Sequence, residues 1–274
     1  MRKVNRSLVT TPNKLINLTD TNLQQLTSHT TISSAVYRHQ DVKDSLAELY
    51  FEKCYICECD VKNAYKVEHY LPKKYFPNLG YSWDNLHKSC EGCNLAKEHA
   101  SFFKTDDNNN VVDILLLDPS SNSYDINDYI RFNINSVAEL VNVGTVPEVI
   151  EKAKNTIKYL NGVYRNEYGK ELKYNRSNRS AKFLKFYIDK ISQHSIIIQK
   201  IKTSGVMNYT APTDPQELST HHALCSELIK LDQVYLNDAA PFSTCTRVSM
   251  IHTFKMPYST FVQMKEKMRL ELGM

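Results

Sequence analysis

Four cysteines in two closely spaced pairs are the most specific chemical signal in this chain of 274 residues. Cys54 and Cys57 form one pair, Cys90 and Cys93 form the other, and 32 residues separate the pairs. Two residues between cysteines allow one tight turn to present both thiolates to a metal, and two such pairs complete a tetrahedral zinc site. Because four protein ligands leave no open position, we expect this zinc to be structural rather than catalytic.

The alternatives to a zinc site are chance spacing and disulfides. Chance rarely produces two pairs with the same spacing. The first residues of the sequence are charged and do not resemble a secretory signal, so we expect the seven cysteines to be in a reducing compartment rather than in disulfides. Cys59 exceeds a four-ligand count, and we expect a small, partly buried side chain there. Cys225 and Cys245 have no partner at this spacing and are expected to be core thiols.

Between the two pairs lie side chains suited to phosphodiester hydrolysis. Glu68 and His69 end a short alternating run, and Pro72 prevents a helix from continuing there. Asn85 lies in the next short segment, and Asn94 directly follows the second cysteine pair. A neutral imidazole can take a proton from water, while a divalent ion held by oxygen ligands stabilises the scissile phosphate.

Three short elements must position these side chains. Residues 65–70 alternate as a strand does, and residues 82–86 can form a second strand. A helix is expected from Cys93 onward, with Asn94 in its first turn, and a helical pattern over 35–53 leads into the first cysteine pair. The order strand, loop, strand, helix is the one expected of a ββα-metal nuclease site.

The pattern resembles the HNH endonuclease motif in its zinc-stapled form, with Glu68-His69, Asn85-Leu86 and Cys90-x-x-Cys93-Asn94-x-x-Lys97. The resemblance implies that His69 is the general base, and that Glu68 and Asn94 are the protein ligands of a catalytic Mg²⁺ or Mn²⁺. It also implies that Asn85 braces the loop carrying the histidine, and that Lys97 lies near a phosphate. The family often has Asp where this chain has Glu68, whose side chain is one methylene longer. Glu68 is therefore expected to contact the metal either directly or through a water molecule.

The segments after the motif are similar to those of the HNH nucleases of Septu-type and retron-associated antiviral systems, often called PtuB. They are Ile114-Leu115-Leu116-Leu117-Asp118-Pro119, Tyr129-Ile130-Arg131-Phe132 and a helical run ending in Tyr159-Leu160-Asn161. This resemblance covers residues 1–165. It implies a cytoplasmic bacterial effector of antiphage defence that works with an ATPase of the ABC/SMC-like class (PtuA-type), alone or with a retron reverse transcriptase and its msDNA. Asp118 itself is expected to brace a turn.

Charge is unevenly distributed along the chain. The net charge of +4 is too small to indicate nucleic acid, but residues 150–205 carry 13 Lys and Arg against 4 Asp and Glu, a local charge of +9. Such a segment can follow a phosphate backbone of DNA or RNA, tRNA included. Five tyrosines among these charges are candidates for stacking on unpaired bases: Tyr159, Tyr164, Tyr168, Tyr174 and Tyr187. The alternative is an ordinary solvated helical surface with aromatic packing.

The remaining histidines match no ligand position of the motif. His87 and His99 flank it and could contact phosphate or metal, whereas His221 and His222 are expected on a helix surface. No run of eighteen apolar residues predicts a membrane span. The sequence has no Gly-x-x-x-x-Gly-Lys-Ser/Thr loop, so any dependence on ATP would come from a partner.

The whole chain is expected to be an α+β protein, predominantly α-helical, in which flanking helices surround a ββα-metal HNH motif with a four-cysteine zinc site. The expected domains are an N-terminal arm over 1–34, an HNH nuclease core over 35–145, and a helical region over 146–274 that binds DNA, RNA or a partner. Helices are predicted to begin at Pro147, to run over 180–203 before Gly205, to extend from Asp214 to Asn237, and to cover 258–272.

The first 34 residues are rich in Thr, Asn and Ser and are expected to form a loosely ordered arm with one short helix over 19–28. The basic side chains of Arg2, Lys3 and Arg6 are expected to be solvated there.

Two other functions are compatible with these motifs. A stand-alone restriction-like or mobile-element HNH nuclease would lack the ATPase partner, and a neighbouring ATPase or reverse-transcriptase gene would argue against it. A noncatalytic zinc module that binds nucleic acid or protein needs the cysteines but not Glu68, His69 and Asn94 together. Their joint presence favours a metal-dependent endonuclease that hydrolyses phosphodiester bonds.

Overall fold

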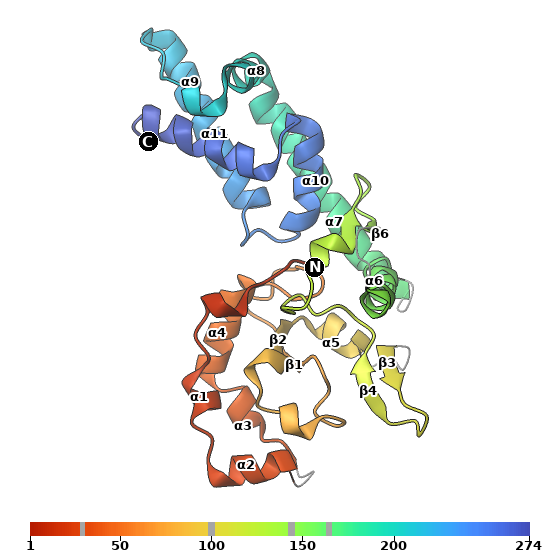
Figure 1. Cartoon of the computed structure of the whole chain (residues 1–274). Helices are drawn as coiled ribbons and strands as arrows, with labels where there is room; N and C mark the ends of the chain where they lie inside the picture. Colours follow the sequence, from red (N-terminus) through yellow and green to blue (C-terminus); the bar gives the residue numbers. More distant parts are fainter. Residues whose placement is uncertain (28–30, 98–101, 142–145, 163–165) are drawn as a thin grey trace. The chain divides into compact units, whose positions relative to one another are not determined.

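The computed structural model describes residues 1–27, 31–97, 102–141, 146–162 and 166–274 (Figure 1). These residues are mainly helical and include three two-stranded sheets, which confirms a predominantly helical α+β chain. The chain divides into two compact units, one of residues 1–131 and 137–173 and one of residues 132–136 and 174–274. The domain boundaries predicted after residues 34 and 145 both fall inside the first unit and stay predictions.

The first unit begins with short helices: η1 (Arg6–Leu8), α1 (Asn13–Ile16), α2 (Asp20–Thr27), α3 (Ser34–Tyr37) and α4 (Gln40–Tyr50). The single helix predicted over 35–53 is wrong, because the extended backbone of His39 separates α3 from α4. One face of α4 is buried at helical spacing, through Val42, Leu46, Leu49 and Tyr50. Left-handed Phe51 ends α4 just before the first cysteine pair.

A two-stranded antiparallel sheet and the helix after it carry the candidate site. Strand β1 (Lys66–His69) pairs with β2 (Leu86–Ser89), which places Glu68 opposite His87 and His69 opposite Leu86. Helix α5 (Glu91–Lys97) follows β2 and contacts β1 (Figure 1). The order strand, strand, helix is therefore present in residues 66–97.

Two predicted bounds in this region are wrong. The strand expected over 82–86 starts only at Leu86, because the N–H of Asn85 bonds the carbonyl of Ser82 and closes the 3₁₀ turn η3 (Trp83–Asn85). A second 3₁₀ turn, η2 (Pro77–Leu79), precedes it in the loop between the strands. Helix α5 starts before Cys93, because the N–H of Asn94 already bonds the carbonyl of Cys90.

The first unit also contains β3 (Phe103–Thr105), β4 (Val111–Ile114), η5 (Ile126–Asp128), β6 (Ala138–Leu140) and α6 (Pro147–Leu160). Strand β5 (Ile130–Phe132), which pairs with β6, lies where the two units meet in sequence. Helix α6 begins at Pro147 as predicted. It is tied to β4 and to the segment after that strand by two side chains: Lys152 pairs with Asp113 of β4 at 2.7 Å, and Thr156 accepts a hydrogen bond from the N–H of Leu117 at 2.9 Å.

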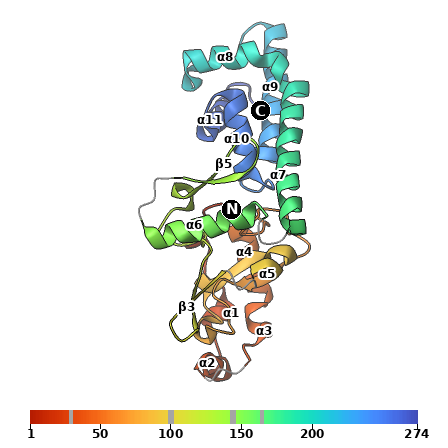
Figure 2. The same ribbon diagram turned by 90° about the vertical axis from the view of Figure 1, so that its right-hand side faces the viewer.

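From residue 174 onward, the second unit is helical in the residues described. The C-terminal part of α7 (Asn166–Phe186) is followed by η6 (Tyr187–Ile191), η7 (Ser192–His194), α8 (Ser195–Ser204), η8 (Val206–Asn208), α9 (Pro215–Leu231), η9 (Asp232–Leu236), α10 (Ser243–Phe254) and α11 (Tyr258–Glu271) (Figure 2). Its core includes Phe183, Leu228, Met250, Phe261 and Met264. Across the described ranges, no helix is both long and apolar enough to cross a membrane.

Local signals predicted several of these helices, but no helix was predicted for α10 or for the part of α7 before residue 180. Gly205, at a φ of 88°, ends α8, and the Asp214 side chain caps α9 by accepting from the N–H groups of Gln216 and Glu217. The continuous α-helix predicted over 180–203 is wrong. A π-helical turn, η6, and a 3₁₀ turn, η7, interrupt it. The Ser192 hydroxyl donates to the Ile188 carbonyl at 2.7 Å and competes with the regular helical bond there.

Arg6 ties the N-terminal segment to β2. Its side chain is 9% exposed, and its two terminal nitrogens donate to the carbonyls of Trp83 and Leu86, both at 2.8 Å. The expectation of solvated basic side chains is wrong, because these side chains find partners on the folded unit. Lys3 donates to the carbonyl of Tyr124 at 2.8 Å, and the Arg2 guanidinium lies 4.6 Å from the centre of the Phe51 ring.

The first prediction concerns this anchor. Arg6→Ala should lower the free energy of unfolding by roughly 1–3 kcal/mol, because the buried Leu86 carbonyl loses the donor that Arg6 supplies, while the Trp83 carbonyl still accepts from the N–H of Leu86. The sole tryptophan, Trp83, lies 5.0 Å from the guanidinium, so urea unfolding followed by its fluorescence reports on this unit. Arg131→Ala is the matched control, because Arg131 is 67% exposed and should change stability by less than about 0.5 kcal/mol. Equal unfolding midpoints for the two variants would contradict the assignment.

Candidate functional site

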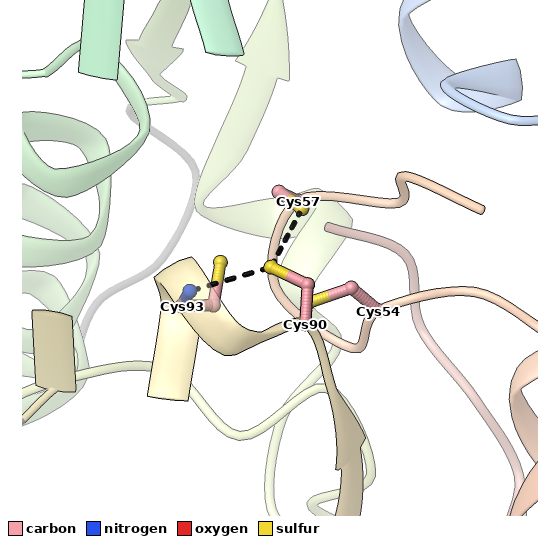
Figure 3. A group of neighbouring side chains, drawn as sticks. All are labelled: Cys54, Cys57, Cys90 and Cys93. Carbon is pink, nitrogen blue, oxygen red and sulfur yellow. Dashed lines mark hydrogen bonds between the residues drawn. The ribbon is translucent and has the colours of Figure 1, made fainter. Parts of the chain in front are cut away.

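The four paired cysteines converge on one point. Cys54 and Cys57 lie on the turn after α4, Cys90 follows β2, and Cys93 lies in α5 (Figure 3). Their sulfur atoms all lie within 4.8 Å of one another, and those of Cys57 and Cys90 are 3.8 Å apart. Zinc–sulfur bonds of about 2.3 Å in a regular tetrahedron place the sulfurs about 3.8 Å apart. The donor set and its spacing therefore fit a zinc ion.

Main-chain hydrogen bonds shape both cysteine turns. The N–H of Tyr55 donates to the carbonyl of Lys88 at 2.8 Å and joins the first turn to β2. The N–H of Cys93 donates to the Cys90 sulfur at 3.3 Å (Figure 3). Hydrogen bonding from the Cys54 thiol lowers the pKa of Cys90 and raises the pKa of Cys57. Cys59 is half-buried and is not one of the four clustered cysteines.

His69 ends β1 in a buried position, 6% exposed. Its Nε2 lies 2.9 Å from the Gly80 carbonyl, and since a carbonyl only accepts, Nε2 carries the hydrogen and donates it. The pKa of His69 is lowered to about 4, mainly by burial and further by the charges of Lys73 and Lys97. The hydrogen bond to Gly80 acts in the opposite direction and raises it. The ring is therefore neutral at pH 7, with its lone pair on Nδ1.

Lys97 links α5 to the end of β1. Its side chain is 2% exposed and its ammonium contacts the carboxylate of Glu68, which is 13% exposed. The same ammonium donates to the carbonyl of His69 and, at 3.2 Å, to that of Tyr70. The position predicted to lie near a phosphate thus also neutralises Glu68 and satisfies main-chain groups beside the histidine.

The two asparagines of the motif lie in different surroundings. Asn85 is 5% exposed; its oxygen accepts from the N–H of Leu71 at 2.7 Å, and its nitrogen donates to the carbonyls of Leu71 at 2.9 Å and Leu79 at 3.2 Å. Asn85 thereby joins the start and the end of the loop that follows His69. Asn94 is half-buried in the first turns of α5.

A pocket of about 380 Å³ lies beside these groups, lined by Glu68, His69, Pro72, Lys73, Lys74, Tyr75, Lys97 and Phe103. The structure therefore brings Glu68, His69 and Lys97 to one cavity, whereas Asn85 and Asn94 are not among its lining residues. Glu68 presents a carboxylate, the donor that Mg²⁺ and Mn²⁺ prefer, so its chemistry fits a hard divalent ion. Asn94 as a second ligand stays a prediction.

His87 belongs to a buried polar network that the sequence did not indicate. Its Nδ1 lies 2.6 Å from the Tyr50 hydroxyl, and its Nε2 lies 3.3 Å from the Arg6 guanidinium and 3.8 Å from the Asp118 carboxylate. Because its side chain is completely buried among these partners, the suggested contact of His87 with a phosphate is wrong, and His87 is not one of the four clustered metal-binding side chains. Asp118 braces a turn as predicted, accepting from the N–H of Ser120 at 2.7 Å.

The other side chains suggested for contact with nucleic acid, His99 and the five tyrosines, differ in their exposure. His99 and Tyr164 lie outside the described residues, as does the side chain of Tyr168. Of the remaining tyrosines, Tyr159 is buried, Tyr187 is half-buried and Tyr174 is 66% exposed.

The basic segment is also only partly a surface. Arg176 is 1% exposed and donates to the Ser136 carbonyl at 3.2 Å, so its charge is not available to a ligand. His221 and His222 are half-buried rather than on an open helix surface, and the Nδ1 of His221 lies 2.8 Å from the Tyr209 hydroxyl. Cys225 and Cys245 are buried, as predicted.

The second prediction concerns the thiol cluster. The purified chain should contain about one zinc ion per molecule by elemental analysis. Cys57→Ser should lose this zinc and lower the melting temperature, because it removes one of four ligands. Cys59→Ser is the matched control and should retain the metal. Retention of zinc in Cys57→Ser, or its loss in Cys59→Ser, would mean that the ligand set is different.

The third prediction concerns pH. Burial, followed by the charges of Arg6 and Lys97, holds the pKa of His87 well below 6.5, so the folded chain keeps the ring neutral. Unfolding lets this histidine take up a proton below about pH 6.5. Its contribution to stability is therefore present above that pH and decreases as the pH falls, by about 1.4 kcal/mol per unit at full slope.

The measurement for this prediction is the free energy of unfolding at about pH 7 and about pH 5.5. The wild type should lose about 1 kcal/mol more between these two values than His87→Gln. The buried His69 titrates in both proteins and cancels in the comparison. Identical pH dependence would show that folding leaves the pKa of His87 unchanged and would contradict the prediction.

Comparison with known proteins finds one partial similarity. No family model and no solved structure matches the chain. The chain is 38% identical over 89 residues to the Septu protein PtuB of Bacillus thuringiensis. The match covers 31% of this chain and 34% of that protein, so the chain spans about a third of the length of this relative. The identity supports a PtuB-like relationship over that part of the chain.

Proposed function

We propose that this chain is a metal-dependent endonuclease of the HNH type that hydrolyses phosphodiester bonds in nucleic acid. The observation that carries the proposal is the pocket in which Glu68 and His69 of β1 meet Lys97 of α5. Under this proposal β1, β2 and α5 are the ββα-metal motif, and the cysteine pair on the turn after α4 forms its zinc staple together with the pair at the start of α5.

In the proposed reaction His69 is the general base. The Gly80 carbonyl holds the hydrogen on Nε2, so that Nδ1 is the atom that takes a proton from water. The negative charge of a phosphate in the pocket favours the protonated ring, which raises the pKa of the histidine from about 4 toward the working pH. His69 thereby becomes a stronger base when substrate is present.

A bound Mg²⁺ or Mn²⁺ supplies Lewis-acid stabilisation of the charge that develops on the phosphate and on the departing 3′ oxygen. Glu68 would hold it, with Asn94 as the proposed second ligand. Lys97 would then add positive charge near the phosphate while it keeps its hydrogen bonds to the main chain at the end of β1. Asn85 keeps the histidine loop in place and does not take part in proton transfer.

We further propose that the chain acts in the cytoplasm of bacteria in antiphage defence, together with an ATPase of the ABC/SMC-like class. The partial identity with the Septu protein PtuB supports this role. The sequence contains no phosphate loop of its own, which agrees with a separate ATPase. DNA or RNA, with tRNA as one RNA target, is the proposed substrate, and a retron reverse transcriptase with its msDNA is a further proposed partner.

The fourth prediction tests the nuclease. His69→Ala should reduce cleavage by roughly 10²–10⁴-fold, because it removes the general base. Cleavage is measured on plasmid DNA and on total RNA with Mg²⁺ and with Mn²⁺, with and without the ATPase encoded beside the gene. His252→Ala, an exposed histidine on α10, is the matched control and should cleave as wild type does.

Zinc content is determined for both variants, so that loss of activity is separated from loss of the fold. Equal cleavage by wild type and His69→Ala would assign the activity to a contaminant or to another site. A wild type that cleaves nothing, even with the ATPase, would favour a zinc module that only binds nucleic acid or protein.

A further inference from the structure

The pocket beside His69 has an aromatic wall that phosphodiester hydrolysis does not require. Tyr75 and Phe103 line it together with the candidate catalytic groups. Tyr75 is 40% exposed and Phe103 is half-buried. The two rings meet edge to face, with centroids 5.6 Å apart and planes inclined by 67°. A large ring left open to solvent in a pocket is a candidate contact for an apolar or aromatic ligand.

Both rings are carried by ordered backbone. Tyr75 lies in a turn after β1, where its N–H and that of Phe76 both donate to the Pro72 carbonyl at 2.9 Å. Phe103 is the first residue of β3 and pairs with Ile114 of β4. Rings held in this way lose little conformational freedom when a ligand stacks on them, so that more of the stacking energy appears as affinity.

The same pocket is positively charged. The ammonium of Lys74 lies 5.1 Å from the centre of the Tyr75 ring, and that of Lys73 donates to the Tyr37 hydroxyl at 2.8 Å. Lys97 and Glu68 neutralise each other, so Lys73 and Lys74 provide the excess charge. Cations beside an aromatic face suit a ligand that joins a phosphate to a planar base, which is a nucleotide.

We propose that Tyr75 and Phe103 form a stacking site for one unpaired base next to the scissile phosphate, and that single-stranded, looped or flipped-out nucleic acid is therefore the substrate class. Bases inside a duplex have both faces covered by their neighbours and cannot stack on a side chain until they leave the helix. A volume of about 380 Å³ is in the range of pockets that hold one small ligand. The inference deepens the proposed nuclease function and rests on it for the position of the phosphate.

The fifth prediction tests the site by binding, in the full chain carrying His69→Ala so that no probe is cut. The probes are single-stranded DNA and RNA oligonucleotides that contain 2-aminopurine, a base whose fluorescence is quenched by stacking, and a duplex of the same sequence. Tyr75→Leu should weaken single-strand binding by roughly ten-fold and remove the quenching, because one base loses its aromatic contact. Tyr75→Phe and Tyr75→Trp should retain both, since they keep an aromatic face.

Lys74→Gln is the matched variant that separates charge from stacking. It should weaken binding of single strand and duplex by the same factor, because it removes one phosphate contact. For the same reason, the slope of log affinity against log salt concentration should become smaller in magnitude by about one. Tyr75→Leu should leave the duplex affinity and the salt dependence unchanged. Zinc content and Trp83 fluorescence confirm that each variant is folded.

Tighter binding of the duplex than of either single strand would overturn the proposal, as would equal weakening of single strand and duplex by Tyr75→Leu. The nuclease function is judged separately, by cleavage in the chain that retains His69. Cleavage of intact duplex that Tyr75→Leu does not affect would retain the nuclease and refute the stacking site. Quenching that depends on Tyr75 in a chain that never cleaves would establish the stacking site and refute the nuclease.

Discussion

The convergence of four thiols is the constraint on which the rest of the candidate site depends. Strands β1 and β2 have four residues each and could not form a stable hairpin alone. The cysteine pairs fasten both ends of the 32-residue segment that contains this hairpin, and a metal bound there adds its binding energy to folding. The pocket wall formed by Glu68, His69 and Lys97 is therefore assembled only when the cysteine turn, β2 and α5 are held together.

Buried polar groups give this small unit a single arrangement. Arg6 satisfies two carbonyls around Asn85, while Lys97 satisfies two carbonyls at the end of β1 and also pairs with Glu68. Removing either cation would leave buried oxygens without donors, which costs more than the net gain of the bonds themselves. The same exclusion of water holds His69 neutral, so the packing that stabilises the hairpin also prepares its histidine to accept a proton.

Hydrolysis of a phosphodiester does not distinguish one base or strand from another, so the proposed nuclease needs a separate source of selectivity. The proposed stacking on the aromatic wall of the pocket would be such a source, because stacking requires an exposed base face and is indifferent to its identity. Part of the positive charge of residues 150–205 is held inside the fold rather than on a surface. Arg176 is buried, and Lys152 of α6 is paired with Asp113 of β4.

By itself, the sequence determined what depends on neighbours a few residues away. Cysteine spacing predicted the thiol cluster, Pro147 and Asp214 predicted helix starts, and the alternating run predicted β1. Helix α10, the helix interruptions and the start of β2 were missed, and the interruptions depend on turns and side-chain bonds that propensity does not encode. Only the tertiary structure decided that Arg6 reaches Ser120, that Lys97 pairs with Glu68 and that Tyr75 meets Phe103. Those partners are 28 to 114 residues apart, and contacts over such separations follow from the packing of the whole unit rather than from any local pattern.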